Sequence, residues 1–210
     1  IDLLSRNTAE GFVYRVDARL RPFGSAGPLS VSLAALEAYL LQHGRDWERY
    51  AYIKARVVNP WDDADGLYRD VLRPFIYRRY LDYGVFSSLR EMKAMIAAEV
   101  EKKEYRANLK LGPGGIREIE FIVQALQLVR GGTVIGLRQQ QLLRALPQLV
   151  QAGCLPAADA ADLETAYCFL RLAENRVQAL HDRQTHDIPA DPLDQQRLAF
   201  AMGMAGWDEF

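Results

Sequence analysis

The residues best suited to chemistry are one carboxylate and its arginine neighbours near the amino-terminal end. Within residues 11–24, Asp17 is surrounded by Arg15, Arg19 and Arg21. A carboxylate can bind a divalent metal ion, and arginines can bind phosphate oxygens, so this group could hold a metal-bound phosphate. The alternative is a surface ladder of ion pairs, because a lone aspartate among arginines is a pattern of low specificity. The residue types leave both interpretations open.

A β-strand is expected to position this carboxylate. Apolar residues alternate with polar ones, which is the period of a half-buried strand, at Phe12, Tyr14, Val16 and Ala18. Asp17 would lie on the opposite face near the end of the strand, since Pro22 and Gly24 follow.

Two more cations are expected on a helix over residues 47–58, which Asn59 and Pro60 should end. Lys54 and Arg56 lie on this helix, and a positive helix that also carries aromatic residues would suit a nucleotide phosphate. The alternative is a solvated helix face.

A glycine-rich loop precedes another helix, expected from residue 116 to the glycine pair at 131–132. Gly112, Gly114 and Gly115 would let a ligand approach the backbone closely, and the amino-terminal end of the helix would favour an anion. No Gly-Lys-Ser/Thr sequence follows, so the loop is not a P-loop.

The polar side of this helix carries Arg117 and Glu120, which lie within about 60° of each other. They form either an i,i+3 ion pair or part of a cleft near Asp17. Phe121 and Leu128 lie on the same side, and large apolar groups are rarely left open to water. We therefore expect the helix to be covered on both sides and to lie between two domains.

The composition indicates a folded protein. The chain has 210 residues, of which half are hydrophobic and a quarter charged, with a net charge of −1. This charge balance argues against a protein that coats nucleic acids or binds to membrane surfaces. No apolar run is long enough to span a membrane. The two cysteines lack metal or redox spacing, which favours a reduced, cytoplasmic setting. The chain does not begin with Met, so we expect a fragment.

The composition changes after Pro60, where a domain boundary is expected. The remainder reads as helices and short turns. Helices are expected from Ser32 to Gly44, over 65–80 with a kink or a break at Pro74, from about 88, and over 137–152, 156–183 and 194–204. His181 and His186 are interpreted as polar residues at a helix end, because their spacing does not suit a helical metal site.

Five stretches of the chain resemble the glutamine synthetase adenylyltransferase family, namely residues 14–24, 27–29, 44–49, 54–56 and 114–121. The resemblance covers essentially the whole chain. It implies a mainly α fold, in which residues 1–60 are the carboxy-terminal part of an α/β nucleotidyltransferase domain. Residues 61–210 would form an all-α helical bundle.

The same resemblance implies an activity, a nucleotidyltransferase or adenylyl-removing phosphorylase. Residues 44–50 and 115–121 are more similar to the adenylyl-removing half of the family. In that half, phosphate attacks the AMP–tyrosine bond of adenylylated glutamine synthetase and gives ADP. The implied partners are adenylylated glutamine synthetase, the PII signal protein, ATP or ADP, and phosphate, and the implied effector is glutamine.

The resemblance also implies roles for single residues. Asp17 matches the third of three carboxylates that hold magnesium, but the Gly-Ser…Asp-x-Asp element with the other two is absent from this chain. The fragment alone is therefore expected to be inactive, since one carboxylate cannot hold two metal ions. From charge and position, Arg19 and Arg21 would act on the phosphate. The nucleotide and phosphate would also be bound by Lys54, Arg56, Arg117 and Glu120.

Two alternatives remain beside this interpretation. The helical region from residue 61 to 210 could be a regulatory or docking module for glutamine synthetase or PII. The chain could also belong to the related PII uridylyltransferase, whose helical region is similar, although residues 14–24 favour the adenylyltransferase.

Overall fold

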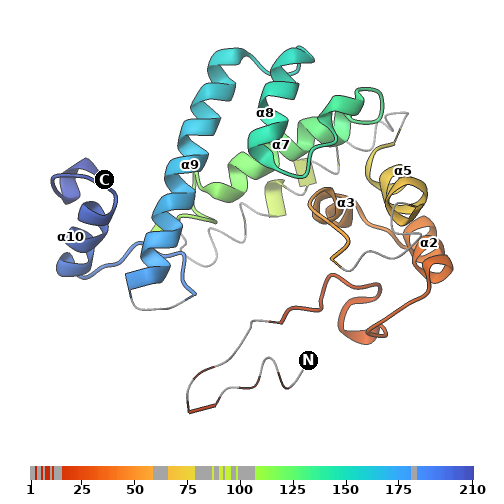
Figure 1. The fold of residues 1–210 in the computed structure, drawn as a ribbon, viewed down its shortest axis with the longest axis horizontal. Coiled ribbons are helices and arrows are strands. Elements are labelled where there is room, and N and C mark those ends of the chain that lie inside the picture. Colours follow the sequence, from red (N-terminus) through yellow and green to blue (C-terminus); the bar gives the residue numbers. More distant parts are fainter. Residues whose placement is uncertain are drawn as a thin grey trace. The chain divides into compact units, whose positions relative to one another are not determined.

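Figure 1 shows a computed structural model of the chain, which is mainly helical, as the sequence predicts. The chain forms two compact units, Ile1–Ile76 and Tyr77–Phe210. The structure describes residues 16–58, 66–78, 107–180 and 184–210, with short pieces between residues 3 and 11 and between 87 and 98. The expected boundary after Pro60 and most of the helix expected from about residue 88 lie outside the described residues. The boundary therefore stays a prediction.

The first unit contains short helices. They are the 3₁₀ turn η1 (Gly24–Ala26), α2 (Leu33–Gln42), α3 (Asp46–Ile53), the π-helical segment η2 (Leu67–Leu72) and α5 (Arg73–Ile76). The predicted cap of α2 is confirmed, because the Ser32 hydroxyl accepts from Ala35 N at 3.2 Å. Pro74 lies in the first turn of α5, directly after the wider π-turns of η2, and the kink or break expected there stays a prediction.

Helix α3 ends five residues earlier than predicted. The N–H groups of Lys54 and Ala55 donate to the carbonyls three residues back, those of Ala51 and Tyr52, at 3.2 and 3.1 Å. These tighter bonds close the last turn, so the helix ends before Asn59 is reached.

Buried polar side chains hold the helices of the first unit together. Arg49 is only 1% exposed, and its Nε and Nη2 donate to the Ile76 carbonyl at 3.1 and 2.9 Å. Glu48 is also buried, and it accepts from the Tyr39 hydroxyl and from Arg45 N, both at 2.8 Å. Arg49 thus links α3 to the end of α5, while Glu48 links α3 to α2.

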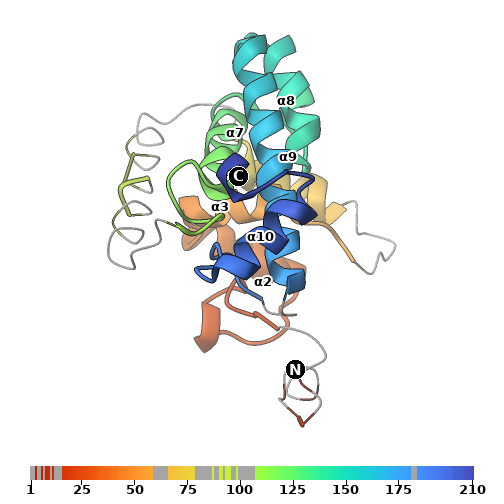
Figure 2. The ribbon, with the colours of Figure 1, turned by 90° about the vertical axis from the view of Figure 1, so that its left-hand side faces the viewer.

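The second unit is built from helices of 10 to 24 residues. They are α7 (Ile116–Arg130), α8 (Leu142–Gln151), α9 (Ala157–Leu180) and α10 (Pro192–Ala201), with the 3₁₀ turns η4 (Ile135–Leu137) and η5 (Trp207–Glu209). Helices α7, α8 and α9 contact one another, and α10 packs on α9 (Figure 2). Two aliphatic clusters hold these helices. The larger includes Val123, Leu137, Leu146 and Leu149, and the smaller includes Ala173, Val177 and Leu198.

The carboxyl end of α7 is closed by side chains from elsewhere in the unit. Arg138 donates to the carbonyls of Gly131 and Gly132, at 2.7 and 3.1 Å, and its guanidinium carbon lies 5.5 Å from the centre of the Tyr77 ring. A cation at this end of a helix satisfies carbonyls that have no partner within the helix. Helix α8 starts later than predicted, because the chain first makes the turn η4. The Gln127 side chain stabilises the end of this turn by donating a hydrogen bond to the Leu137 carbonyl at 2.7 Å.

Candidate functional site

Asp17 lies in a segment without regular secondary structure rather than in the predicted strand. Residues 16–18 have no strand pairing and residues 19–20 form a turn, while residues 12–15 lie outside the described part. The carboxylate instead accepts from the backbone N–H of Arg19 at 3.0 Å. This local bond offers the backbone an alternative to sheet pairing.

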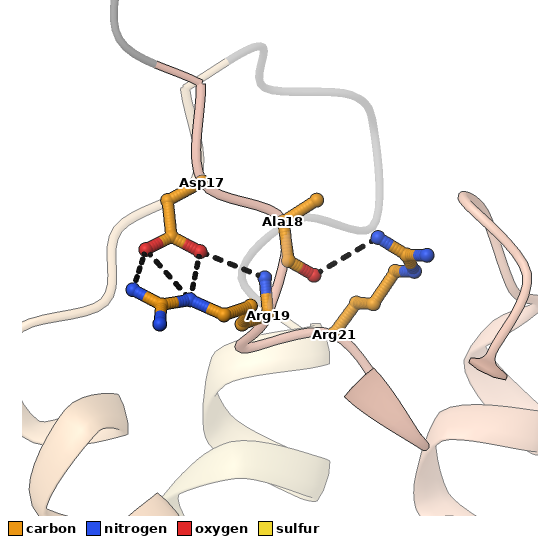
Figure 3. Close-up of polar contacts among 4 residues, drawn as sticks. All are labelled: Asp17, Ala18, Arg19 and Arg21. Carbon is orange, nitrogen blue, oxygen red and sulfur yellow. Dashed lines mark hydrogen bonds and ion pairs between the residues drawn. The ribbon is translucent and has the colours of Figure 1, made fainter. Parts of the chain in front are cut away.

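The Asp17 carboxylate is also bound by the Arg19 guanidinium (Figure 3). Nη2 donates to Oδ2 at 2.6 Å, and Nε lies 3.0 and 3.1 Å from the two oxygens. The Asp17 side chain is 40% exposed and that of Arg19 is 76% exposed. Water therefore screens the pair, so the arginine can move to another anion at little cost.

Arg21 organises the loop that follows. Its guanidinium donates to three carbonyls, those of Ala18 at 3.1 Å, Ser25 at 3.2 Å and Gly27 at 3.0 Å. Figure 3 shows it directed away from Asp17 toward Ala18. Its expected contact with phosphate stays a prediction, while its contacts with the loop are structural.

The residues present do not by themselves fit a magnesium site. Within the part of the chain that the structure describes, no cluster of three or more metal-ligating side chains occurs. Asp17 contributes one carboxylate, and its oxygens are already bonded to Arg19. Magnesium requires near-octahedral oxygen coordination, so further ligands would have to come from outside this set.

The cations predicted on α3 are exposed at its end. Lys54 is the C-cap residue of α3 and Arg56 follows it, and both side chains are exposed. Arg49 lies seven residues before Arg56, on the side that a regular helix would share with it, but it is buried and bonded to the Ile76 carbonyl. The spacing could not reveal this, because it predicts a direction around the helix but not what lies there.

The expected anion site at the amino-terminal end of α7 is wrong. The N–H groups of Ile116 and Arg117 donate to the carbonyls of Leu109 and Lys110, at 3.0 and 2.9 Å. The Glu118 carboxylate accepts from Gly114 N at 2.8 Å. The loop's own groups thus occupy the end of the helix. A side chain at Gly115 would meet the carbonyls of Gly112 and Leu109 at 2.8 Å, so the glycine serves internal packing.

Arg117 and Glu120 are where the helical spacing places them, on α7 in the second unit, the first exposed and the second half-buried. The covered polar side of this helix is confirmed at Leu128, which is 3% exposed. Because Asp17 belongs to the first unit, the expected cleft that would bring these residues together stays a prediction.

A buried charge cluster on α9 escaped the sequence reasoning. Glu174 is buried, and its oxygens lie 2.7 Å from Arg171 Nη1 and 2.8 Å from His186 Nδ1. The interpretation of His186 as a helix-end residue is wrong, since it lies in the loop after α9 and its carbonyl accepts from Leu109 N. His181 lies outside the described residues. The one feature of the sequence that could have indicated this cluster was the position of Glu174 between the apolar residues Ala173 and Val177, which are buried.

The loop after α9 is also joined to the loop before α7. Asn108 Nδ2 donates to the Asp187 carboxylate at 2.6 Å, and Ile188 N donates to the Ala107 carbonyl at 2.8 Å. These contacts hold the glycine-rich loop in place from outside.

No described helix is long and apolar enough to cross a membrane.

Comparisons with known proteins match the chain along nearly its whole length. The family model described as glutamate-ammonia ligase adenylyltransferase matches residues 1–68, and that described as GlnD PII-uridylyltransferase matches residues 90–210. A bifunctional glutamine synthetase adenylyltransferase/adenylyl-removing enzyme of Shewanella loihica is 50% identical over 98% of the chain. Enzymes of the same name from Stenotrophomonas maltophilia and Xanthomonas oryzae are 52% and 53% identical over the same share.

The chain spans 22% of the length of these relatives, so it corresponds to one segment of them. Both the stretch around Asp17 and the helical unit fall within the matched region. The chain therefore belongs to the glutamine synthetase adenylyltransferase family, and its residues 90–210 belong to the family that the PII-uridylyltransferase model describes.

Proposed function

We propose that this chain is part of a cytoplasmic enzyme that adds AMP to glutamine synthetase and removes it, and that it belongs to the adenylyl-removing half. The observation that carries the proposal is the identity of about half the residues, over 98% of the chain, with relatives named for both activities. The assignment to the adenylyl-removing half rests on the amino-acid sequence of residues 44–50 and 115–121.

The proposed reaction is phosphorolysis. An oxygen of inorganic phosphate attacks the phosphorus of the AMP group, the bond from that phosphorus to the tyrosine oxygen breaks, and the products are ADP and unmodified glutamine synthetase. Such a transfer needs positioning and neutralisation of charge rather than a covalent intermediate. ATP or ADP, phosphate and the PII protein are the further proposed ligands and partners.

Asp17 is proposed to supply one ligand of a magnesium site that the rest of the longer protein completes. When bound, the ion would neutralise charge on the transferred phosphoryl group. The exposed pairing of Arg19 with Asp17 supports a role for Arg19 on phosphate, because binding of the carboxylate to a cation would release the guanidinium. Arg21, Lys54, Arg56, Arg117 and Glu120 are proposed as further phosphate and nucleotide contacts.

The test of the site uses the longer protein that carries the missing carboxylates. Asp17→Ala should lower adenylyl removal at least about 100-fold, as loss of a group that stabilises transition-state charge does. Asp70→Ala is the matched control, because Asp70 forms the same kind of exposed pair with its neighbour Arg69. Retained turnover by Asp17→Ala would exclude the proposed role.

The purified 210-residue chain is expected to be inactive, since it supplies too few carboxylates for the metal site. Incubation with adenylylated glutamine synthetase, phosphate and magnesium should release no ADP above background. Detectable ADP would show that the chain contains a complete site and would overturn this part of the proposal.

The match of residues 90–210 to the PII-uridylyltransferase model favours a second candidate for the helical unit, a regulatory module that docks PII or glutamine synthetase. Retention of PII or of glutamine synthetase by the immobilised chain would support docking, and loss of both would exclude it. Preference for UTP over ATP in the longer protein would instead favour a uridylyltransferase.

A further inference from the structure

A pocket opens beside α3 in the first unit, with a volume of about 340 Å³. It lies next to the turn that carries Arg19, because Leu20 forms part of its wall. The residues that line it are Leu20, Trp47, Glu48, Ala51, Tyr52, Lys54 and Ala55. The pocket thus joins the Asp17–Arg19 segment to the cationic end of α3.

The lining suits a flat aromatic ring. Trp47 and Tyr52 supply aromatic surface, and the small side chain of Ala51 lies one helical turn from Trp47. Tyr52 is held in place by edge contact with Phe75, with ring centres 6.0 Å apart. Aromatic rings stack on such surfaces with little demand for hydrogen bonds, and pockets of this volume are at the small end of ligand sites.

The polar groups at the pocket set the charge of its ligand. Glu48 contributes to the wall, but its two carboxylate oxygens already accept from the Tyr39 hydroxyl and Arg45 N. The exposed Lys54 is the cation in the pocket lining. Arg19 directly precedes the lining residue Leu20 in the chain. An aromatic ligand with a negatively charged substituent is therefore complementary to the pocket.

We propose that this pocket binds the purine base of the nucleotide, stacked on Trp47, with the phosphate on the side of Lys54. The inference rests on the proposed function, which makes AMP a part of the substrate, and it adds where the base is held. The tyrosine ring that carries the AMP group is the other aromatic candidate. The volume favours the larger, bicyclic base, and the test separates the two.

The experiment uses the 210-residue chain with Trp61→Phe and Trp207→Phe, which leaves Trp47 as its single tryptophan. AMP, adenosine, N-acetyltyrosinamide and inorganic phosphate are titrated in turn, and Trp47 fluorescence is recorded. AMP and adenosine should quench it saturably, and AMP should bind more tightly than adenosine. Lys54→Gln should remove this difference and leave adenosine binding unchanged.

Ala51→Leu should fill the pocket and weaken AMP binding at least about tenfold, as loss of base stacking does. Ala34→Leu, on the exposed surface of α2, is the matched control and should bind AMP as the parent does. Circular dichroism confirms that each variant is folded.

Absence of quenching by adenosine, or equal binding by Ala51→Leu, would overturn the proposal. Quenching by N-acetyltyrosinamide alone would assign the pocket to the tyrosine. Quenching by AMP without activity in the longer protein would contradict only the proposed function. Loss of activity in Asp17→Ala without quenching would contradict only the pocket.

Discussion

The described parts of the two units differ in the balance of the interactions that join their helices. In the first, short helices are joined by the buried Arg49 and Glu48, whose partners are a carbonyl, a carboxylate, a hydroxyl and a backbone N–H. In the second, α7, α8 and α9 are joined by aliphatic residues such as Leu146 and Leu149. The helices α2, α3, η2 and α5 of the first unit have four to ten residues, so each offers little apolar surface.

The difference indicates how each unit responds to change. An aliphatic core tolerates substitutions of similar volume, because its attraction is not directional. A buried hydrogen-bonded cation does not, since removing one partner leaves a buried polar group unsatisfied. We expect the first unit to depend on a few polar atoms, and the second on the volume of its core.

The largest effect is expected from a cavity in the second unit. Leu149 is 0% exposed, so Leu149→Ala should lower the free energy of unfolding by about 3 kcal/mol. Leu143→Ala is the control on the same helix, because Leu143 is 41% exposed. Urea denaturation followed by circular dichroism measures both. Equal effects of the two substitutions would contradict the aliphatic core described for this unit.

A smaller but clear loss is expected from Arg49→Met in the first unit. Methionine fills a similar volume but cannot donate the two hydrogen bonds that the buried Ile76 carbonyl accepts from Arg49. The unsatisfied carbonyl should lower the free energy of unfolding by about 2 kcal/mol. Arg56→Met, at an exposed position, should have little effect. Thermal unfolding compares the two variants. If Arg49→Met were as stable as Arg56→Met, the contrast between the units would fail.

The smallest effect concerns pH in the second unit. Burial, followed by the charge of Lys110, lowers the pKa of His186, while Glu174 and Asp187 act in the opposite direction. The folded chain therefore binds this proton less readily than the unfolded chain. Stability should fall as the pH drops below about 6.5, the ordinary value for histidine.

Denaturant unfolding at a series of pH values between neutral and mildly acidic tests this expectation. His186→Gln should flatten the dependence on pH, because it removes the group whose pKa burial lowers. If the stability of His186→Gln still depended on pH in the same way, the dependence would come from other groups. The two units would then not differ through His186.

The sequence predicted the second unit better than the first, for a physical reason. The extent of α7 and most of α9 followed from apolar residues three and four positions apart, because that spacing is the direct consequence of burying one helix face. The cap at Ser32 was predictable because it is local. The whole-chain family resemblance was also available from the motifs alone.

The remainder depended on partners distant in the chain or on competition between local bonds. Nothing near Arg49 in the sequence indicates that it would bond to Ile76, 27 residues away. The carboxylate of Asp17 favours a local bond over a strand, and the glycine-rich loop fills the end of α7 with its own carbonyls. Spacing describes one element at a time, so these outcomes lie beyond it.

The closed end of α7 has a consequence for how the family can vary. A Cβ atom at Gly131 would lie 2.6 Å from the Tyr77 ring and 2.5 Å from the Gln127 carbonyl, so no larger residue fits there while the ring stays. The aromatic ring in turn supports the guanidinium of Arg138. We therefore expect positions 77, 131 and 138 to change together in evolution, as one inherited unit.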